Sequence, residues 1–211
     1  MHTRLLTFSG ATNIDAGVDY LRDEVVPVLD AQPGYRGVSA SADRPGAILS
    51  ILSLWDTEAD RAESDSPLGK AREEALKLVG GTLSIEDLEQ VVSSVIKIPV
   101  PGCALYLSRV SMDPASIDDN IAFFKDEMLP RIDAAPGFCA LRNMVDRRTG
   151  QAVVGTIFED RTSLDAFVAG NEDRRASAAV RGISFGESSI RELLLSETKR
   201  FATRTVRSFS G

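Results

Sequence analysis

Residues 23–34 read DEVVPVLDAQPG, and residues 126–137, 103 positions later, read DEMLPRIDAAPG. Seven of the twelve positions are identical, and an aromatic residue follows each stretch, Tyr35 or Phe138. An internal repeat of this length indicates one structural unit that occurs twice. We therefore predict a first copy over residues 1–98, a linker over 99–102, a second copy over 103–198 and a C-terminal tail over 199–211.

The residues before each Pro-Gly carry the apolar spacing of a helix. Apolar side chains recur every three or four residues and predict one stripe that faces the core. Pro-Gly then ends the helix. The stripe residues are Ile14, Val18, Leu21, Val25 and Leu29 in copy one, and Ile117, Ile121, Phe124, Met128 and Ile132 in copy two.

The rest of each copy alternates between strand and helix patterns. A hairpin follows each Pro-Gly, then a helical region, then a closing strand. The expected ranges are strands 4–9, 35–43, 47–55 and 88–98 with a second helix over 57–78, and strands 104–110, 138–146, 151–158 and 190–197 with a second helix over 162–180. This order is the β-α-β-β-α-β ferredoxin-like motif. Its helices leave one sheet face bare, so we predict an α+β fold in which the two copies pack sheet to sheet.

Composition and charge exclude several classes of protein. The 211 residues carry a net charge of −7, which argues against binding to nucleic acid. No apolar run approaches the about 18 residues of a membrane helix, and the N-terminus lacks a signal-peptide pattern. We expect a soluble cytoplasmic protein. Cys103 and Cys139 lie outside any CxxC pair and on strands that are not neighbours, so we expect free thiols and no disulfide.

The tail over residues 199–211 has a composition of its own. It holds Lys199, Arg200, Arg204 and Arg207 and no acidic residue. Its alternating pattern is typical of an extended segment. Because the body is acidic, we expect the tail to dock against the body or a second chain.

Two motifs, each present in both copies, resemble those of a known superfamily. The first is Pro27-x-Leu29-x3-Pro33-Gly34-Tyr35, matched by Pro130-x-Ile132-x3-Pro136-Gly137-Phe138. The second is Trp55-Asp56-Thr57-Glu58-Ala59, matched by Phe158-Glu159-Asp160-Arg161. The chain resembles the dimeric α/β-barrel superfamily, especially its antibiotic-biosynthesis-monooxygenase-like branch, over nearly its whole length.

The resemblance implies a barrel with the helices outside. Two chains usually form it. Here the second copy would act as the partner of the first within one chain, and a homodimer of the whole chain stays open. Members include cofactor-free oxygenases of polycyclic aromatic or quinol-like substrates, haem-degrading enzymes, and isomerase-like and dehalogenase-like enzymes.

The chain departs from the haem-degrading members. Those enzymes hold haem with a histidine on the helix after the motif tryptophan, whereas the only histidine here is His2. His2 could serve as a general base, but a residue this close to the terminus is usually mobile. We expect no haem, no other cofactor and no metal site.

Four residues are candidates for binding a small apolar ligand. Trp55 and Phe158 either form an aromatic wall of the cleft between sheet and helices or pack in the core. Tyr35 either offers its hydroxyl to a ligand or packs on the preceding helix. Asn143 stands where copy one has Ala40, and points either into the cleft or to solvent. No residue is identified as catalytic.

Two functions are compatible with these patterns. One is a cofactor-free oxygenase that acts on a flat apolar or aromatic substrate, whose carbanion reacts with oxygen once the protein has bound, oriented and deprotonated it. The other is a non-catalytic binding or structural protein on the same scaffold. A cavity with a polar group at its end would favour the oxygenase, and a cleft filled with side chains in both copies would favour the alternative.

Overall fold

The computed structural model describes residues 1–199, except for the side chains of residues 171–174. Most of the predicted docking tail, residues 200–211, lies outside the described residues. Its first residue, Lys199, donates its backbone N–H to the carbonyl of Arg36 at 2.9 Å and its ammonium group to the carbonyl of Asp30 at 2.6 Å.

Each copy has the predicted order of elements. Copy one contains β1 (His2–Ser9), α1 (Ile14–Tyr20), a π-helical turn (Leu21–Val25), α2 (Val26–Asp30), β2 (Tyr35–Asp43), β3 (Ile48–Trp55), α3 (Glu58–Glu63), α4 (Asp65–Val79) and β4 (Thr82–Val95). Copy two contains β5 (Ala104–Ser111), a 3-10 turn (Pro114–Ser116), α5 (Ile117–Phe123), a π-helical turn (Phe124–Met128), α6 (Leu129–Asp133), β6 (Phe138–Asp146), β7 (Gln151–Phe158), α7 (Arg161–Ala169), α8 (Asn171–Ala179) and β8 (Ser184–Thr198).

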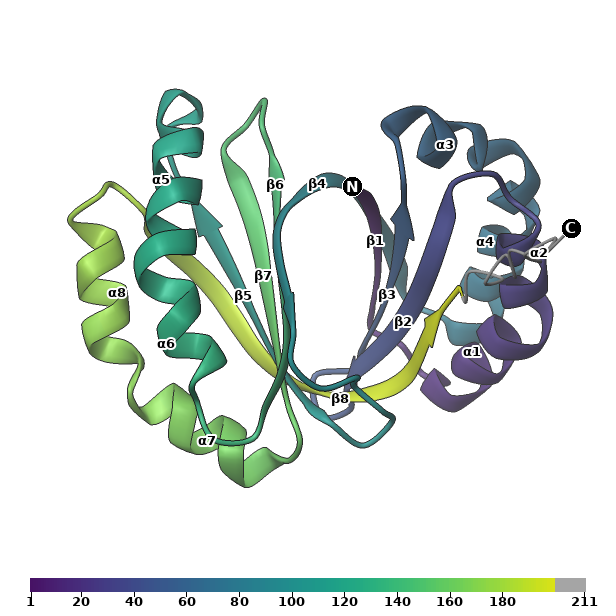
Figure 1. Ribbon diagram of the computed structural model, residues 1–211. Coiled ribbons are helices and arrows are strands. Elements are labelled where there is room, and N and C mark those ends of the chain that lie inside the picture. Colours follow the sequence, from purple (N-terminus) through teal and green to yellow (C-terminus); the bar gives the residue numbers. More distant parts are fainter. Residues whose placement is uncertain (200–211) are drawn as a thin grey trace, which may run out of the picture.

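The eight strands form one closed antiparallel barrel in the order β1-β3-β2-β8-β5-β7-β6-β4. The helices of copy one and of copy two cover opposite outer sides of this barrel (Figure 1). The predicted α+β fold, with two ferredoxin-like units packed through their sheets, is therefore confirmed. The described residues contain no helix that is long and apolar enough to cross a membrane.

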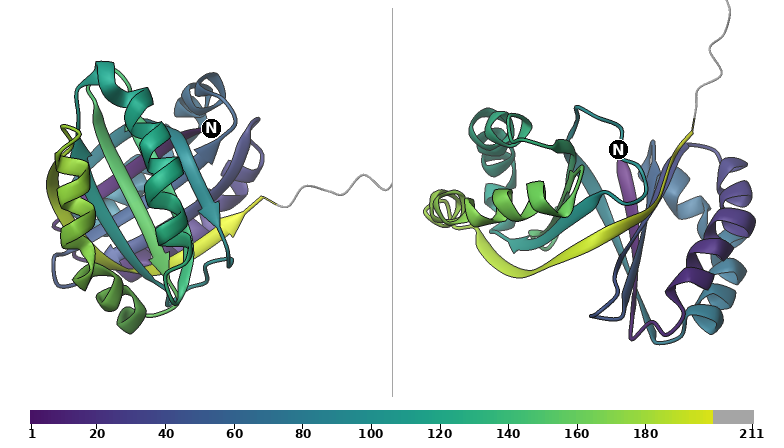
Figure 2. Two further views of the ribbon diagram at one scale, coloured as in Figure 1. Left: turned by 60° about the vertical axis from the view of Figure 1, so that its left-hand side comes forward. Right: turned by 90° about the horizontal axis from the view of Figure 1, so that it is seen from below.

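The closing strands differ from the prediction. β4 begins at Thr82 rather than at residue 88, and β8 begins at Ser184 rather than at residue 190. Each is long because it belongs to both sheets: β4 pairs first with β1 and then with β6, and β8 pairs first with β5 and then with β2. Figure 2 shows β8 running from the sheet of copy two to that of copy one. The first half of β8 is mostly polar and exposed, so it lacks the apolar signal of a strand. In β4 the alternating Leu83 and Ile85 lie ahead of the predicted start and belong to the strand.

Both first helices widen at the same place. The N–H of Val26 donates to the carbonyl of Leu21, and the N–H of Leu129 donates to the carbonyl of Phe124, which are i-to-i−5 bonds of a π-helical turn. A proline follows each turn and cannot donate the next helical hydrogen bond. The repeated proline thus produces the same local widening in both copies.

The two cysteines are free thiols in or next to strands that are not neighbours, as predicted, but they lie in one cluster. Cys103 and Cys139 share one buried cluster with Leu193 and are both free thiols. β7 separates their strands, but both residues lie at the same end of the barrel wall. Burial, with Cys103 beside it, raises the pKa of Cys139 to about 11, so its thiol stays protonated at neutral pH.

Candidate functional site

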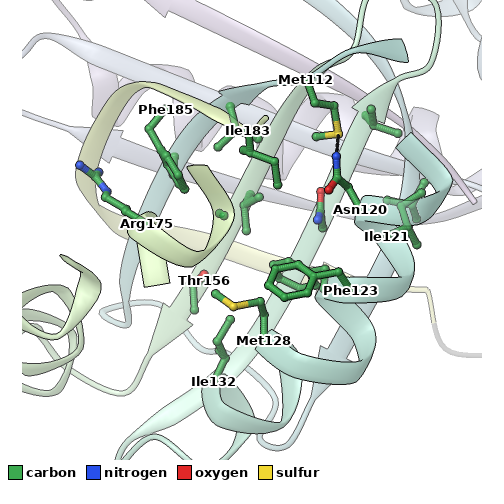
Figure 3. A pocket seen from close by; sticks show the side chains of 18 of the residues that line it. Met112, Asn120, Ile121, Phe123, Met128, Ile132, Thr156, Arg175, Ile183 and Phe185 are labelled. Carbon is green, nitrogen blue, oxygen red and sulfur yellow. Dashed lines mark hydrogen bonds between the residues drawn. The ribbon is translucent and has the colours of Figure 1, made fainter. Parts of the chain in front are cut away.

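A cavity of about 120 Å³ lies between the sheet and the helices of copy two (Figure 3). β5, β6 and β7 form its floor, and α5, the following π-helical turn and α8 form much of its roof. Most of the lining is apolar. Six lining residues carry a polar side chain: Tyr106, Ser108, Asn120, Asn143, Thr156 and Arg175.

Strand pairing arranges the polar floor residues in two neighbouring rows. Tyr106 pairs with Thr156 in one row. In the next row, Val154 pairs with Ser108 on one side and with Asn143 on the other. Tyr106, Ser108, Asn143 and Thr156 therefore surround one apolar residue at the centre of the floor. This pattern suits a flat apolar molecule with polar groups on its edge.

The Asn143 amide is free to bind a ligand. Its neighbours on the same face, Leu141 and Val145, are buried, whereas Asn143 lines the cavity. Within the described part of the chain, its side chain has no hydrogen-bond partner. Buried polar groups normally have a partner, so this amide is available to a ligand or to water.

Asn120 is a positioning residue rather than a free donor. Its Nδ2 donates to Ser116 Oγ at 3.2 Å and contacts Met112 Sδ at 3.6 Å (Figure 3). Its Oδ1 accepts from Arg181 Nε at 3.4 Å, and the Arg181 guanidinium lies 4.5 Å from the centre of the Phe123 ring. These contacts fix α5 above the cavity.

Tyr106 and Arg175 meet at another part of the lining. Arg175 Nη2 donates to Tyr106 Oη at 2.9 Å, and its guanidinium lies 5.2 Å from the centre of the Phe185 ring. Because the phenol oxygen accepts this bond, its own proton can be donated to a ligand. α8 thus turns Arg175 toward the sheet.

The equivalent cleft of copy one is nearly closed. Its cavity measures about 50 Å³. Phe8 and Leu49 are paired and fully buried there, whereas the equivalent pair in copy two is Val110 and Ala152. The larger side chains fill the space that stays open in copy two.

Helix packing adds to the difference between the copies. A Cβ atom on Gly17 would lie 2.4 Å from Val79 Cγ2 and 3.0 Å from Leu49 Cδ2, so only glycine lets α1 approach this closely. The equivalent residue of α5 is Asn120, at the repeat offset of 103. The copy-one helix therefore lies tightly on its core, and the copy-two helix does not.

The polar groups of the copy-one cleft are already paired. Arg4 stands where copy two has Tyr106, and its guanidinium is bonded to Asp87 and Asp65. Ser53 accepts a hydrogen bond from Trp55 Nε1 at 3.0 Å. Ala40 takes the place of Asn143. Copy one is thus built as a core and copy two as a cavity.

The structure places the aromatic candidates in the cores. Trp55 is 1% exposed and meets Tyr35 edge to face at 5.6 Å between ring centres. Phe158 is fully buried between Phe138 and Phe167. None of the three candidates is among the residues that line the two clefts. This placement agrees with the interpretation that Trp55, Phe158 and Tyr35 pack in the core. Of the four candidate residues, Asn143 is the one that lines a cleft.

Tyr35 keeps one unusual feature. Its hydroxyl oxygen is buried without a hydrogen-bond partner among the described residues. Burial raises the pKa of Tyr35 well above its ordinary value, and the carboxylates of Asp30 and Glu197 add to the effect. The phenol is therefore neutral at physiological pH.

His2 is not a frayed terminus, contrary to the expectation for a residue this near the end of the chain. It lies in β1, in register with Trp55 on one side and Glu89 on the other. It is not among the residues that line the copy-two cavity. Among the described residues, no group of three or more His, Cys, Asp or Glu side chains is arranged to hold a metal ion.

Comparisons with known proteins agree with this architecture. No protein-family model matches the chain. A Mycobacterium tuberculosis (strain H37Rv) protein of uncharacterised function is 29% identical over 180 residues, which cover 85% of this chain and 78% of that protein.

Solved structures show the same fold at low sequence identity. A candidate monooxygenase from Fusobacterium nucleatum superposes with a TM-score of 0.68 at 15% identity, over 94% of each chain. An anthrone oxidase-like protein superposes with a TM-score of 0.64 at 13% identity, over 93% of this chain and 92% of that chain. The chain has the dimeric α/β-barrel fold of these monooxygenase-like proteins, and its two halves are tandem copies in one chain.

Proposed function

We propose that the chain is a cofactor-free oxygenase that binds a small hydroxyaromatic molecule in the cavity of copy two. The observation that carries the proposal is the Asn143 amide, which has no partner in the described part of the chain and faces an apolar cavity. Copy one has Ala40 at this place and a nearly closed cleft. Copy two would then carry the activity, and copy one would complete the barrel.

The size and lining of the cavity support an aromatic ligand. An apolar cavity of about 150 Å³ holds one benzene ring, so about 120 Å³ suits a single ring. Phe185, which lines the cavity, is 37% exposed, so the cavity reaches the surface there. A second fused ring would extend toward this opening.

Two donors would stabilise charge on the substrate oxygen. When a hydroxyaromatic compound loses its hydroxyl proton to water, negative charge spreads over the oxygen and the ring carbons. In this proposal the Tyr106 hydroxyl and the Asn143 amide, which both line the cavity, would supply the donors to that oxygen. Donors that are fixed in place before the reaction stabilise such charge more than water does.

The oxidation itself uses only the substrate and molecular oxygen. The electron-rich ring carbon forms a bond to one oxygen atom, and the O–O bond then breaks. One oxygen atom becomes a ring carbonyl, and the other leaves as water with the two hydrogens lost from the substrate. All electrons come from the substrate: α-naphthol and oxygen give naphthoquinone and water. The name of the anthrone oxidase-like neighbour supports this type of chemistry.

A non-catalytic binding protein is the second candidate function, and one observation favours it. The described residues that line the cavity include no carboxylate and no imidazole. General bases in enzymes are most often of these two types. A pure binding protein would need only the apolar walls and the polar groups of the floor.

Oxygen uptake and binding separate the two candidates. The protein is incubated with α-naphthol or anthrone without added cofactor, and oxygen consumption and quinone absorbance are followed. Binding is measured separately without oxygen by isothermal titration calorimetry. We expect the protein to bind the compound and to consume one molecule of oxygen for each molecule oxidised. Binding without uptake would reject the oxygenase and leave the binding protein, and no binding would reject both for these compounds.

A further inference from the structure

The inside of the barrel holds a second and larger cavity. It measures about 750 Å³, within the usual range of about 300–1,000 Å³ for ligand sites. The sheet separates it from the cleft of copy two. Both copies contribute leucines to its walls, among them Leu5, Leu52, Leu54, Leu105, Leu107 and Leu193. The wall also has a polar part, which includes Ser39, Ser41, Ser50 and Ser196.

Arg142 lines this cavity, and no carboxylate among the described residues neutralises its charge. Its Nη1 donates to Gln90 Oε1 at 2.5 Å. No carboxylate forms an ion pair with it within the described part of the chain. Burial lowers the pKa of Arg142 from its ordinary value, which reflects the loss of water around the guanidinium.

A second guanidinium lies behind the cavity wall. Arg191 is 7% exposed, and it donates to the hydroxyls of Ser50 and Ser189. Ser50 itself lines the cavity. Burial lowers the pKa of Arg191, and the nearby charge of Arg109 lowers it further, although Asp43 opposes both effects.

The charge of Arg109 is balanced, unlike that of the other two. Its Nη2 lies 2.6 Å from an oxygen of Glu86, in an ion pair that joins the two copies. The cavity is thus bordered by two cations, the half-buried Arg142 and the buried Arg191, which are bonded only to neutral groups among the described residues. An unpaired buried charge is costly, and an anion placed beside it offsets that cost.

The mouth of the cavity is apolar. Val95 and Ile98 line it and are 54% and 76% exposed. Ile96 and Val100, beside them in the chain, are 65% and 56% exposed. An exposed apolar segment of this kind marks a surface that binds apolar molecules. The charged residues at the mouth are Glu197 and Lys199, one of each sign.

We propose that the barrel interior binds a monocarboxylate with a long apolar chain, of the fatty-acid type, with its carboxylate on the Arg142 guanidinium. The leucine walls would hold the chain, and Arg191 would add positive potential through Ser50. The site is independent of the copy-two cleft, because it lies on the other face of the sheet.

A fluorescent fatty acid tests the proposal directly. Dansyl-undecanoic acid is titrated into the intact protein, and the rise in its emission is followed. We expect saturable binding of one molecule per chain. Arg142→Leu should weaken binding by about ten- to hundredfold, the usual effect of losing a hydrogen bond to a charged group. Unchanged affinity in a folded variant would overturn the proposal.

Two controls isolate the charge of Arg142. Arg148→Leu removes the same charge from a side chain that is 87% exposed, and should leave binding unchanged. The alcohol with the same dansyl chain has no carboxylate, so the wild-type protein should bind it at least tenfold more weakly than the acid. This comparison needs no variant, so it decides the matter even if Arg142→Leu fails to fold. Equal affinity for acid and alcohol would reject the carboxylate site.

The two proposals fail separately. Oxygen uptake with α-naphthol does not report on the barrel interior, and dansyl-undecanoic acid does not report on the cleft. Displacement of the dansyl probe by α-naphthol at equal concentration would show that both ligands share one cavity. That result would overturn the independent barrel site and leave the cleft proposal to be judged by its own assay.

Discussion

Arg142 and Asn143 are adjacent on β6 and face two different cavities: the Arg142 side chain lines the barrel interior, and the Asn143 side chain lines the cleft under the helices. Successive residues of a strand point to opposite faces of the sheet. One strand therefore provides polar groups of different chemistry to two sites, a cation to one and a neutral amide to the other.

Asn143→Leu should weaken ligand binding in the cleft without unfolding the protein. The change removes a hydrogen-bond donor but keeps a side chain of similar size. We expect the affinity for α-naphthol to fall by about three- to tenfold, the effect of one neutral hydrogen bond. Calorimetry measures the affinity. Asn13→Leu, at an exposed residue remote from the cleft, serves as the control, and equal losses in both variants would contradict a role for Asn143.

Val110→Phe should close the copy-two cavity. It introduces the residue that copy one has at the equivalent place, Phe8, which is fully buried. Because Val110 lines the cavity, the added ring has space to enter, and we expect loss of α-naphthol binding with a melting temperature near that of the wild type. A variant that still binds α-naphthol with full affinity would show that the ligand site lies elsewhere.

Leu49→Ala tests whether the cleft of copy one is a packed core. Leu49 is fully buried opposite Phe8. Removing its side chain from a filled core should lower the free energy of unfolding by about 2–5 kcal/mol. Urea unfolding measures this change. A loss below about 0.5 kcal/mol, typical of surface positions, would mean that the copy-one cleft is not a packed core.

Leu21 and Phe124 hold equivalent places in the helix stripe but should respond differently to alanine. The sequence pattern alone predicts equal losses. Leu21 is 3% exposed in the core of copy one, so Leu21→Ala should cost about 2–5 kcal/mol. Phe124 is half-buried and lines the cavity, so Phe124→Ala should cost less. Chemical unfolding of both variants decides, and a larger loss at Phe124 would contradict the open cavity.

The repeat predicted the fold because its signals are local. The apolar stripe, the Pro-Gly end of each first helix and the hairpins are encoded within a few residues of each other. The helix ends and hairpins form as predicted, and a π-helical turn interrupts the stripe of each first helix. Closure of the barrel was missed in part. β4 and β8 each join the two sheets, which depends on contacts between the copies rather than on a local pattern, and the first half of β8 is mostly polar.

The sequence singled out the cavity residue Asn143 because the two copies can be compared directly at that position. The repeat offset of 103 aligns Asn143 with Ala40, and this difference is visible in the sequence. The first strands follow an offset of 102 instead, because Ala104 pairs with Phe158 as His2 pairs with Trp55. A shift of one residue moves a side chain to the other face of a strand.

The sequence comparison did not identify two residues of the cavity, Tyr106 and Arg175. At an offset of 103, Tyr106 aligns with Thr3, whereas the structure matches it with Arg4. Its contact with Arg175 joins residues 69 apart in the chain and depends on how α8 packs on the sheet. No local pattern contains that information.

The ion pairs in the copy-one cleft predict how stability depends on pH. Asp87 accepts from Arg4 Nε at 2.7 Å and also pairs with Arg61. Burial raises the pKa of Asp87, but the hydrogen bonds from Arg4 and Arg61 outweigh it, so the pKa lies below its ordinary value of 3.8. A carboxylate with a lowered pKa stabilises the fold above its unfolded pKa, and the contribution disappears as the pH falls through the folded pKa.

Asp87→Asn should therefore destabilise the protein at pH 7 and lose this effect in acid. Arg4 and Arg61 are both more than nine-tenths buried, and the variant leaves them short of a partner. We expect the melting temperatures of wild type and variant to differ at neutral pH. The difference should shrink once the pH falls below the unfolded value of about 3.9 and should vanish only below the lowered folded pKa of Asp87, where the wild-type carboxylate is protonated too. Asp19→Asn, at a carboxylate whose side chain is 62% exposed, should change the melting temperature little at any pH. A wild-type advantage that persists undiminished at pH 2 would show that the carboxylate charge is not what stabilises this cleft.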